Sequence, residues 1–170
     1  MVRIALVGRS GAGKTTIASF LHDNYGFAVC STGLRCRVLA REFFGTESKL
    51  VLNQVTDAMR RIDPAIWLKL ALRQLSGEET KIVIDSARFW DDYLHAKSRG
   101  FVVWRIECPT EIRLARLASR GQQYSLADEG HRAEWELDSV AADSVVDNSG
   151  CIEALASVVS GTLQLLDEQR

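Results

Sequence analysis

Short apolar runs alternate with stretches of helical spacing along the whole chain. Two of the runs, residues 4–7 and 82–84, are apolar at every position instead of alternating with polar residues. Continuous apolar character is what central strands buried on both faces require. The pattern therefore predicts an α/β fold of three layers, a five-stranded parallel sheet with helices on both faces. The predicted strands are residues 2–7, 27–30, 82–85, 102–106 and 144–146.

Two segments interrupt this alternation. Residues 34–76 have helical spacing but are too long for a simple crossover, so we expect two or three helices that close over a second ligand. Residues 121–130 are polar and bounded by glycines, which predicts a mobile lid. We expect one domain over residues 1–170, with a helical acceptor-binding insertion at about 34–76 and a lid at about 120–131. Apolar residues of the insertion are expected to pack in the core instead of stacking on a base: Met59, Trp67, Leu68, Leu72 and Leu75.

The first predicted strand is followed by Gly8-Arg9-Ser10-Gly11-Ala12-Gly13-Lys14-Thr15, which has the spacing of a phosphate-binding P-loop. Such a loop presents backbone N–H groups to a polyphosphate, and its glycines leave room for the approach. Lys14 can reach the β- and γ-phosphates, Thr15 can ligate Mg²⁺, and the following helix adds a positive end. An ordinary glycine-rich turn is the alternative. The residues expected to hold the nucleotide are Gly8, Ser10, Gly11, Ala12, Gly13, Lys14, Thr15 and Thr16.

Polar residues also follow the other predicted strands. They are Ser31-Thr32-Gly33, Asp85-Ser86-Ala87-Arg88 and Asn148-Ser149-Gly150. The carboxyl ends of parallel strands share one edge of the sheet, and ligands of such folds collect there. We therefore expect these residues to face the same site as the phosphate-binding loop.

Composition narrows the range of partners. The 170 residues are 46% hydrophobic, enough for one buried core, and the formal net charge of −1 gives no general positive field for nucleic acid or an anionic membrane. The four cysteines are scattered, so we expect reduced thiols in place of zinc ligands or disulfides. With no leader pattern or long apolar run, we expect a cytoplasmic protein, a monomer or homodimer, whose partners are small-molecule nucleotides.

Switches, motors and kinases all share a phosphate-binding loop, so other residues must separate them. Transfer of a phosphoryl group between two bound anions needs cations that neutralise both donor and acceptor phosphates. The chain has three groups of arginines near the predicted strand ends and the lid, which favours a kinase. They are Arg35 and Arg37, Arg88, and Arg113, Arg116 and Arg120.

Three further stretches resemble the phage-type deoxynucleoside monophosphate kinases. Residues 83–89 are similar to the family's V-I-x-D-x-R-F-x-x-E, residues 131–134 to H-x-S-E, and residues 142–155 to A-D-x-V-I-x-N-x-G-S-x-E-x-L. Dephospho-coenzyme A kinases share the loop and the last of these patterns. The departures are Ala133 at the serine, Asp92 near the glutamate, and Cys151 at a small polar residue. The resemblance implies the P-loop NTPase fold, with ATP and Mg²⁺ as cofactors.

The resemblance also implies roles at the reacting phosphates. Asp85 would order a Mg²⁺-bound water while Thr15 ligates the metal, and Arg88 would clamp the acceptor phosphate. The alternative for Arg88 is an ion pair with Asp91 or Asp92. The implied catalytic residues are Lys14, Asp85, Arg88 and Arg120, and the implied metal ligands are Thr15 and Asp85.

Other positions are assigned to the two substrates. Ser31-Thr32-Gly33 resembles the acceptor motif of adenylate kinases, S-T-G-D-x-x-R, with Arg37 at the matching arginine. On the donor side, Arg116 and Arg120 would contact phosphates, whereas Arg113 is expected to be solvated. Asn148 would bring backbone near the adenine, or form an ordinary turn, and Glu134 would contact substrate or stabilise a helix N-terminus. The implied acceptor-binding residues are Thr32, Arg37, Arg88, His131 and Glu134.

These expectations favour ATP-dependent phosphorylation of a nucleoside monophosphate, with a deoxynucleotide as the first candidate. The acceptor is already an anion, so the reaction needs alignment and charge neutralisation, and no obligatory general base. One alternative is a dephospho-coenzyme A kinase or another small-molecule kinase. The other is a nucleotide-binding switch or ATPase that hydrolyses with a protein partner.

Overall fold

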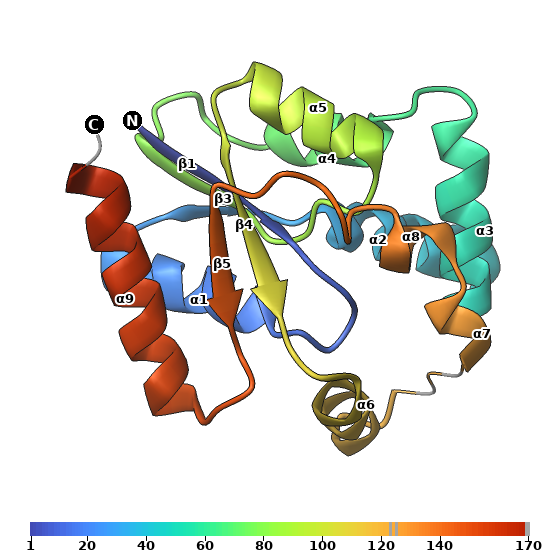
Figure 1. Ribbon diagram of the computed structural model, residues 1–170. Coiled ribbons are helices and arrows are strands. Elements are labelled where there is room, and N and C mark those ends of the chain that lie inside the picture. Colours follow the sequence, from blue (N-terminus) through green and yellow to red (C-terminus); the bar gives the residue numbers. More distant parts are fainter. Residues whose placement is uncertain (123, 125, 169–170) are drawn as a thin grey trace.

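The structure is a computed structural model that describes residues 1–122, 124 and 126–168. Its sheet has five parallel strands in the order β2-β3-β1-β4-β5, which places the strand before the glycine-rich loop at the centre (Figure 1). This confirms the predicted fold class, and each strand lies within one residue of its predicted bounds at either end. The strands are β1 (Val2–Val7), β2 (Ala28–Cys30), β3 (Lys81–Ile84), β4 (Val102–Glu107) and β5 (Ser144–Asp147).

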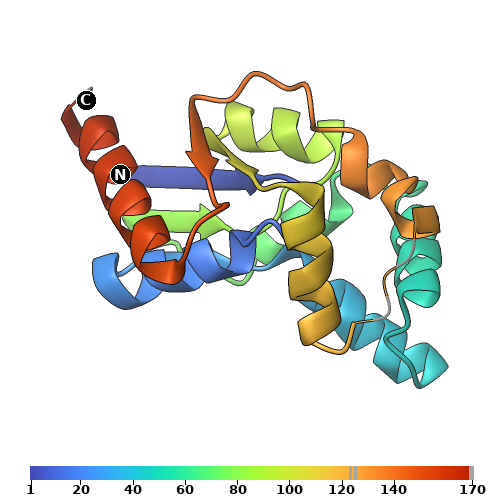
Figure 2. The ribbon, with the colours of Figure 1, turned by 60° about the horizontal axis from the view of Figure 1, so that its bottom comes forward.

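Helices cover both faces of the sheet and extend past the carboxyl ends of its strands. Helices α1 and α9 lie on one face and α4 and α5 on the other, while α2, α3, α7 and α8 gather beyond the strand ends (Figures 1 and 2). Their bounds are α1 (Lys14–Tyr25), α2 (Thr32–Phe44), α3 (Lys49–Arg60), α4 (Ile66–Leu72), α5 (Trp90–Ser98), α6 (Thr110–Ser119), α7 (Leu126–Glu129), α8 (Arg132–Trp135) and α9 (Ile152–Glu168).

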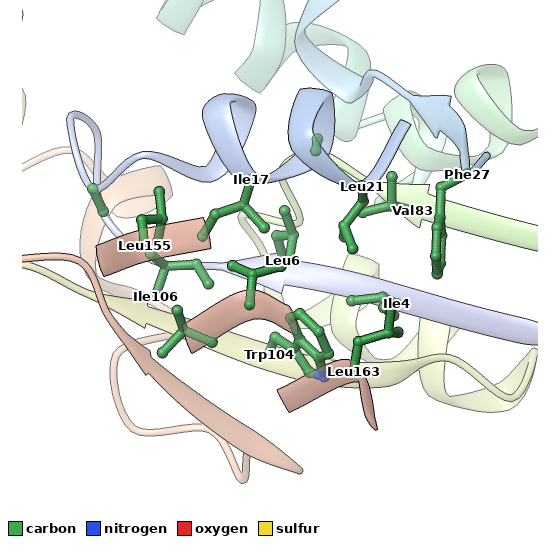
Figure 3. Packing of buried hydrophobic residues seen from close by; sticks show 14 residues of the cluster. Ile4, Leu6, Ile17, Leu21, Phe27, Val83, Trp104, Ile106, Leu155 and Leu163 are labelled. Atoms are coloured by element: carbon green, nitrogen blue, oxygen red, sulfur yellow. The ribbon is translucent and has the colours of Figure 1, made fainter. Parts of the chain in front are cut away.

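The central strand explains the two-sided core. Ile4 and Leu6 of β1 belong to the cluster packed under α1 and α9, whereas Ala5 and Val7 belong to the cluster under α4 and α5. Side chains alternate between the two faces of a strand, so a run of four apolar residues serves both clusters. Figure 3 shows the first cluster, which includes Ile17, Leu21, Phe27, Val83, Trp104, Ile106, Leu155 and Leu163.

The long segment between β2 and β3 contains the helices α2, α3 and α4, and its first helix begins at Thr32, two residues before the predicted start. Ser48 precedes α3 and its hydroxyl accepts a hydrogen bond from the backbone N–H of Val51 at 3.4 Å, which caps that helix. The predicted lid contains α7, but its positions 123 and 125 lie outside the described residues. Among the described residues, no helix has both the length and the apolar character needed to span a bilayer.

Candidate active site

The loop between β1 and α1 has a backbone that only glycine fits at three positions, Gly8, Gly11 and Gly13, and the last two show which parts of the chain lie against it. Gly11 has a φ of 78°, and a Cβ atom there would lie 2.6 Å from the carbonyl oxygen of Arg113. Gly13 has a φ of 99°, and its Cβ atom would lie 2.0 Å from Nδ2 of Asn148. Left-handed backbone favours glycine, and these contacts exclude a side chain as well. The loop is therefore pressed closely against α6 and the segment after β5, as Figure 2 shows for α6.

One predicted donor-side residue, Asn148, braces this loop directly, and a second, Arg116, holds Asn148 in place. Asn148 is buried, and its Nδ2 donates a 2.7 Å hydrogen bond to the carbonyl oxygen of Ala12. Arg116 donates from NH1 to the backbone oxygen of Asn148 at 3.0 Å and from NH2 to that of Gly150 at 3.3 Å. Arg120, in contrast, lies exposed where α6 ends. The structure thus brings Asn148 and Arg116 to the loop and leaves Arg120 at the surface.

Lys14 begins α1 and folds back over the loop. Its Nζ donates to the carbonyl oxygens of Gly8 at 2.5 Å and Arg9 at 2.8 Å, and the residue is buried. Burial, reinforced by the positive charge of Arg88, lowers the pKa of Lys14 from 10.5 to about 7. Both of these partners are neutral carbonyl oxygens. A phosphate in the loop would give the ammonium a negatively charged partner in direct contact. Thr15, the next residue, is exposed in the first turn of the helix and Thr16 is half-buried.

A buried carboxylate stands against the loop. Glu134 of α8 has no exposed side-chain surface, and it accepts hydrogen bonds from the backbone N–H and the hydroxyl of Ser10, both at 2.8 Å. It also pairs with Lys49 at 3.0 Å and with Arg88 at 3.3 Å. Burial alone would raise the pKa of Glu134, but the charges of Arg88 and Lys49 and the bonds from Ser10 outweigh it and hold that pKa well below its ordinary value. The Glu134 carboxylate therefore lies where the loop meets two cations, Lys49 and Arg88, and we call this place the junction.

Arg88 reaches this junction from the segment between β3 and α5. Its Nε donates to the hydroxyl of Ser86 at 3.0 Å and its NH1 pairs with Glu134. The alternative ion pair with Asp91 or Asp92 is not formed by the guanidinium, because Asp92 accepts from backbone N–H groups and Asp91 pairs with Arg60. The Arg88 guanidinium is therefore oriented toward the phosphate-binding loop.

Asp85 is buried at the end of β3, where its Oδ1 accepts a 3.3 Å hydrogen bond from the backbone N–H of Thr32. The Thr32 hydroxyl donates to the carbonyl oxygen of Ser86 at 2.5 Å, which joins the start of α2 to the same strand end. Asp85 also interacts electrostatically with Lys14. Its carboxylate and the Thr15 hydroxyl are hard oxygen donors of the kind that Mg²⁺ prefers.

A pocket opens beside Arg88 between α2, α3, α4, α5 and α8, and we call it the acceptor pocket. Its volume is about 90 Å³, below the ~300 Å³ at which small-molecule sites begin, so a whole nucleotide requires these helices to separate. Cationic side chains and aromatic rings share its lining, a combination suited to a ligand with an anionic group and a flat ring. The lining residues are Thr32, Gly33, Cys36, Arg37, Lys49, Leu52, Asn53, Thr56, Trp67, Arg88, Phe89, Asp92 and Ala133.

The five residues assigned to the acceptor are therefore divided in the structure. Thr32, Arg37 and Arg88 line the acceptor pocket, and Glu134 lies at its junction with the loop. His131 lies apart from the pocket: its Nδ1 accepts from the backbone N–H of Ala133 at the start of α8, and its Nε2 lies 3.5 Å from Asp57 of α3. Lys49 is a further cation of the site that was not predicted. No motif in the sequence around it indicates a binding role.

The expectation that Arg113 is solvated was wrong. Arg113 is 2% exposed, and its NH1 donates to the carbonyl oxygen of Ser10 at 2.8 Å and to Glu129 at 2.9 Å. Arg9 of the loop also pairs with Glu129, at 2.8 Å. The hydrogen bond from Arg113 lowers the pKa of Glu129, so this carboxylate stays ionised between two arginines. Arg113 thus ties the loop to α7, a contact that depends on tertiary structure and could not be seen in helical spacing alone.

Replacing Arg113 by alanine is expected to lower the free energy of unfolding by about 3 kcal/mol, because breaking a buried ion pair leaves its partner incompletely neutralised. The matched control is Arg120→Ala, at the exposed end of the same helix, which should change it by less than about 0.5 kcal/mol. Urea denaturation of the three proteins measures both values. Equal stability of the two variants would contradict the role of Arg113 as a buried tie.

Comparison with known proteins agrees with this geometry. The AAA_18 family, described as an AAA domain, matches residues 4–136. Over 125 residues the chain is 30% identical to an adenylate kinase of Mycoplasmopsis pulmonis, covering 69% of this chain and 58% of that protein. Over 119 residues it is 31% identical to a cytidylate kinase of Methanocella arvoryzae, covering 69% of this chain and 62% of that protein. The alignments thus span about three fifths of each relative's length.

Solved structures share the fold over almost the whole chain. The protein TT1252 of Thermus thermophilus matches with a TM-score of 0.66 at 20% identity, covering 97% of both chains. Shikimate kinase of Acinetobacter baumannii, solved with shikimate, gives 0.61 at 14% identity, with 100% of this chain and 95% of that one covered. Deoxyadenosine kinase of M. mycoides, solved with dCMP and dCDP, gives 0.61 at 14% identity, with 97% and 100% covered. At these identities the likeness concerns the fold.

Proposed function

The chain belongs to the AAA_18 family of AAA domains, which confirms its recognition as a member of the P-loop nucleoside monophosphate kinase superfamily, and on this premise we propose that it is an ATP-dependent phosphotransferase. Its acceptor is a nucleoside monophosphate, with a deoxynucleotide as the first candidate. The observation that carries the proposal is the position of Arg88, which lines the acceptor pocket and pairs with a carboxylate bound to the loop through Ser10. A phosphate bound in the loop or in the acceptor pocket can take the place of this carboxylate.

The residues present fit ATP and Mg²⁺. The loop has the glycine positions that a polyphosphate cradle needs, and Lys14 is already buried within it. Thr15 and Asp85 would hold the metal, the first directly and the second through water. When bound, Mg²⁺ neutralises phosphate charge and leaves the alignment of donor and acceptor to the protein. The partners are then small-molecule nucleotides, and the chain acts as a monomer or homodimer without nucleic acid or membrane.

The sequence of events follows from the junction at Glu134. The acceptor's phosphate replaces the Glu134 carboxylate at Arg88 and Lys49, because both groups are anions that need the same cations. Lys14 leaves the carbonyl oxygens of the loop and turns to the donor phosphates. Arg88 then neutralises charge on the acceptor side while Lys14 does so on the donor side, and no residue has to remove a proton from the acceptor.

The proposal is tested by ADP release in the presence of ATP, Mg²⁺ and a panel of acceptors. The panel contains the common deoxynucleoside and ribonucleoside monophosphates, dephospho-coenzyme A, shikimate and gluconate. Turnover restricted to nucleoside monophosphates supports the proposal, and turnover restricted to another acceptor replaces it. Shikimate is included because the chain shares its fold with shikimate kinase. Hydrolysis without any acceptor, stimulated by a protein partner, would indicate a switch or ATPase.

Nucleotide binding is expected to take up a proton at Lys14. In the free protein this pKa is about 7, so at pH 8.5 the amine is mostly neutral, whereas a bound polyphosphate favours the ammonium. Binding of ATP at pH 8.5 should therefore take up nearly one proton, and binding at pH 6 should take up close to none. Isothermal titration calorimetry in buffers of different ionisation enthalpy measures the uptake. The control is Lys14→Met, in which the difference between the two pH values should disappear.

A further inference from the structure

Two buried polar atoms of the acceptor pocket lack a partner among the described residues. Trp67 of α4 and Asp92 of α5 both line the pocket, and they are 4% and 3% exposed. The indole Nε1–H of Trp67 and the Oδ1 atom of Asp92 make no hydrogen bond to any described residue. Buried polar groups in folded proteins nearly always have partners, so these two need an explanation. A ligand that bonds to both atoms provides one.

The other oxygen of Asp92 is already engaged. Its Oδ2 accepts from the backbone N–H groups of Phe89 at 3.2 Å and Arg88 at 3.3 Å, at the start of α5. Burial raises the pKa of Asp92 to about 6, so at pH 7.5 the group is mostly a carboxylate and only accepts. The nearby guanidinium of Arg60 lies 3.6 Å from the Phe89 ring centre and donates to Pro64 and Asp91. Oδ1 is thus one acceptor, available to one donor of a ligand.

The pocket accordingly offers one hydrogen-bond acceptor, one donor and aromatic walls. We propose that Asp92 and Trp67 are specificity-determining residues that bind the base of the acceptor, cytosine or adenine, through its exocyclic amino group and an unprotonated ring nitrogen. Asp92 accepts from the amino group and Trp67 donates to the ring nitrogen. This inference rests on the proposed function, since it assigns the base of a nucleoside monophosphate at the same site.

The other bases fit these atoms less well. Thymine and uracil place their N3–H between two carbonyl oxygens, which repel a carboxylate approaching that donor. Guanine presents two neighbouring N–H donors, which match a carboxylate with both oxygens available, and Asp92 has only one. Specificity of this kind comes from unfavourable contacts with the wrong base as much as from favourable contacts with the right one.

Asp92→Asn reverses the hydrogen-bonding character of the pocket. The two backbone N–H groups at the start of α5 keep the amide oxygen facing them, so the new NH₂ group takes the place of Oδ1. An amino group would then face a donor, and a carbonyl oxygen would find a partner. We expect kcat/KM for dCMP and dAMP to fall about 10- to 100-fold, while that for dTMP stays constant or rises.

Trp67→Phe keeps an aromatic ring but removes the N–H donor together with part of the indole. We expect the preference for dCMP and dAMP over dTMP to fall about 5- to 10-fold. The matched control is Trp104→Phe. The Nε1 atom of Trp104 is also buried and makes no hydrogen bond to a described residue. Trp104 lies away from the pocket, in the core cluster under α1 and α9 (Figure 3). This control should leave the preference unchanged, which separates base binding from loss of packing.

Equilibrium binding of each monophosphate to all four proteins distinguishes failure of this inference from failure of the proposed function. If the protein transfers phosphate but neither Asp92→Asn nor Trp67→Phe changes the preference among bases, the inference is overturned and the function stands. If no transfer occurs but binding prefers cytosine and adenine in a way that Asp92→Asn abolishes, the inference stands and the function does not. Absence of both binding and transfer overturns both. Should Asp92→Asn fail to fold, Trp67→Phe against Trp104→Phe decides alone.

Discussion

Replacing Lys14 by alanine is expected to reduce phosphoryl transfer by about 10²- to 10³-fold while leaving the protein folded, because a preorganised cation at the donor phosphates is lost. Among the described residues, its ammonium bonds only to the carbonyl oxygens of Gly8 and Arg9, and its burial already disfavours the charged form. Removing the side chain therefore costs little folding free energy, and the carbonyl groups gain access to water. Single-turnover rates with saturating ATP and acceptor measure the chemical step.

The matched control for this experiment is Lys97→Ala. Lys97 lies on α5, is partly exposed and pairs with Asp143. The substitution therefore removes a lysine and an ion pair far from the loop. It should alter neither transfer nor stability by a measurable amount. Near-normal transfer in Lys14→Ala, together with an unchanged unfolding midpoint, would contradict the assignment of the loop as the site of the donor phosphates.

The sequence was sufficient for the parts of the fold that depend on local patterns. The apolar runs at 4–7 and 82–84 became the adjacent central strands β1 and β3, because strands covered on both faces cannot carry polar side chains. The loop was equally local, since its glycines stand where the turn after β1 needs a positive φ. Both features could be predicted because each is encoded within a few neighbouring residues.

Features that depend on distant contacts were not predictable in the same way. The spacing of Arg113 and Arg116 places them on one face of a helix, but only the position of Glu129 makes the first of them a buried ion pair. Lys49 joins the junction because α3 brings it to Glu134, 85 positions away in the sequence. For Asp92, a local signal did exist. It is the third residue of α5, three positions after Phe89, where an acidic side chain commonly accepts from the backbone N–H groups at the start of a helix.

The site roles of Lys14, Asp85, Arg88 and the other predicted residues remain predictions. The structure places most of them around one junction, and it leaves Arg120 exposed and His131 paired with Asp57. For these two, the predicted roles, catalysis for Arg120 and acceptor binding for His131, require movement of the lid region or of α8. Kinetic experiments on the junction itself are therefore more decisive than experiments at its edges.

Arg88→Ala is expected to lower kcat/KM for the acceptor by about 10- to 100-fold, because a charge-assisted hydrogen bond to its phosphate is lost. The same change should destabilise the fold by about 2 kcal/mol. That value is below the 3–5 kcal/mol typical of buried pairs because Arg88 is 32% exposed and Lys49 remains 3.0 Å from the Glu134 carboxylate. Acceptor kinetics and urea denaturation measure the two effects separately.

A second substitution separates these two roles of Arg88. In the Arg88→Ala protein, Glu134→Gln removes the buried charge that Arg88 had neutralised, and the amide can still accept from Ser10. We therefore expect the double variant to recover most of the lost stability and none of the lost acceptor kcat/KM. Recovery of both would mean that Arg88 serves only to neutralise Glu134. Recovery of neither would mean that the lost stability comes from another contact of Arg88, such as its hydrogen bond to Ser86, and not from the charge left on Glu134.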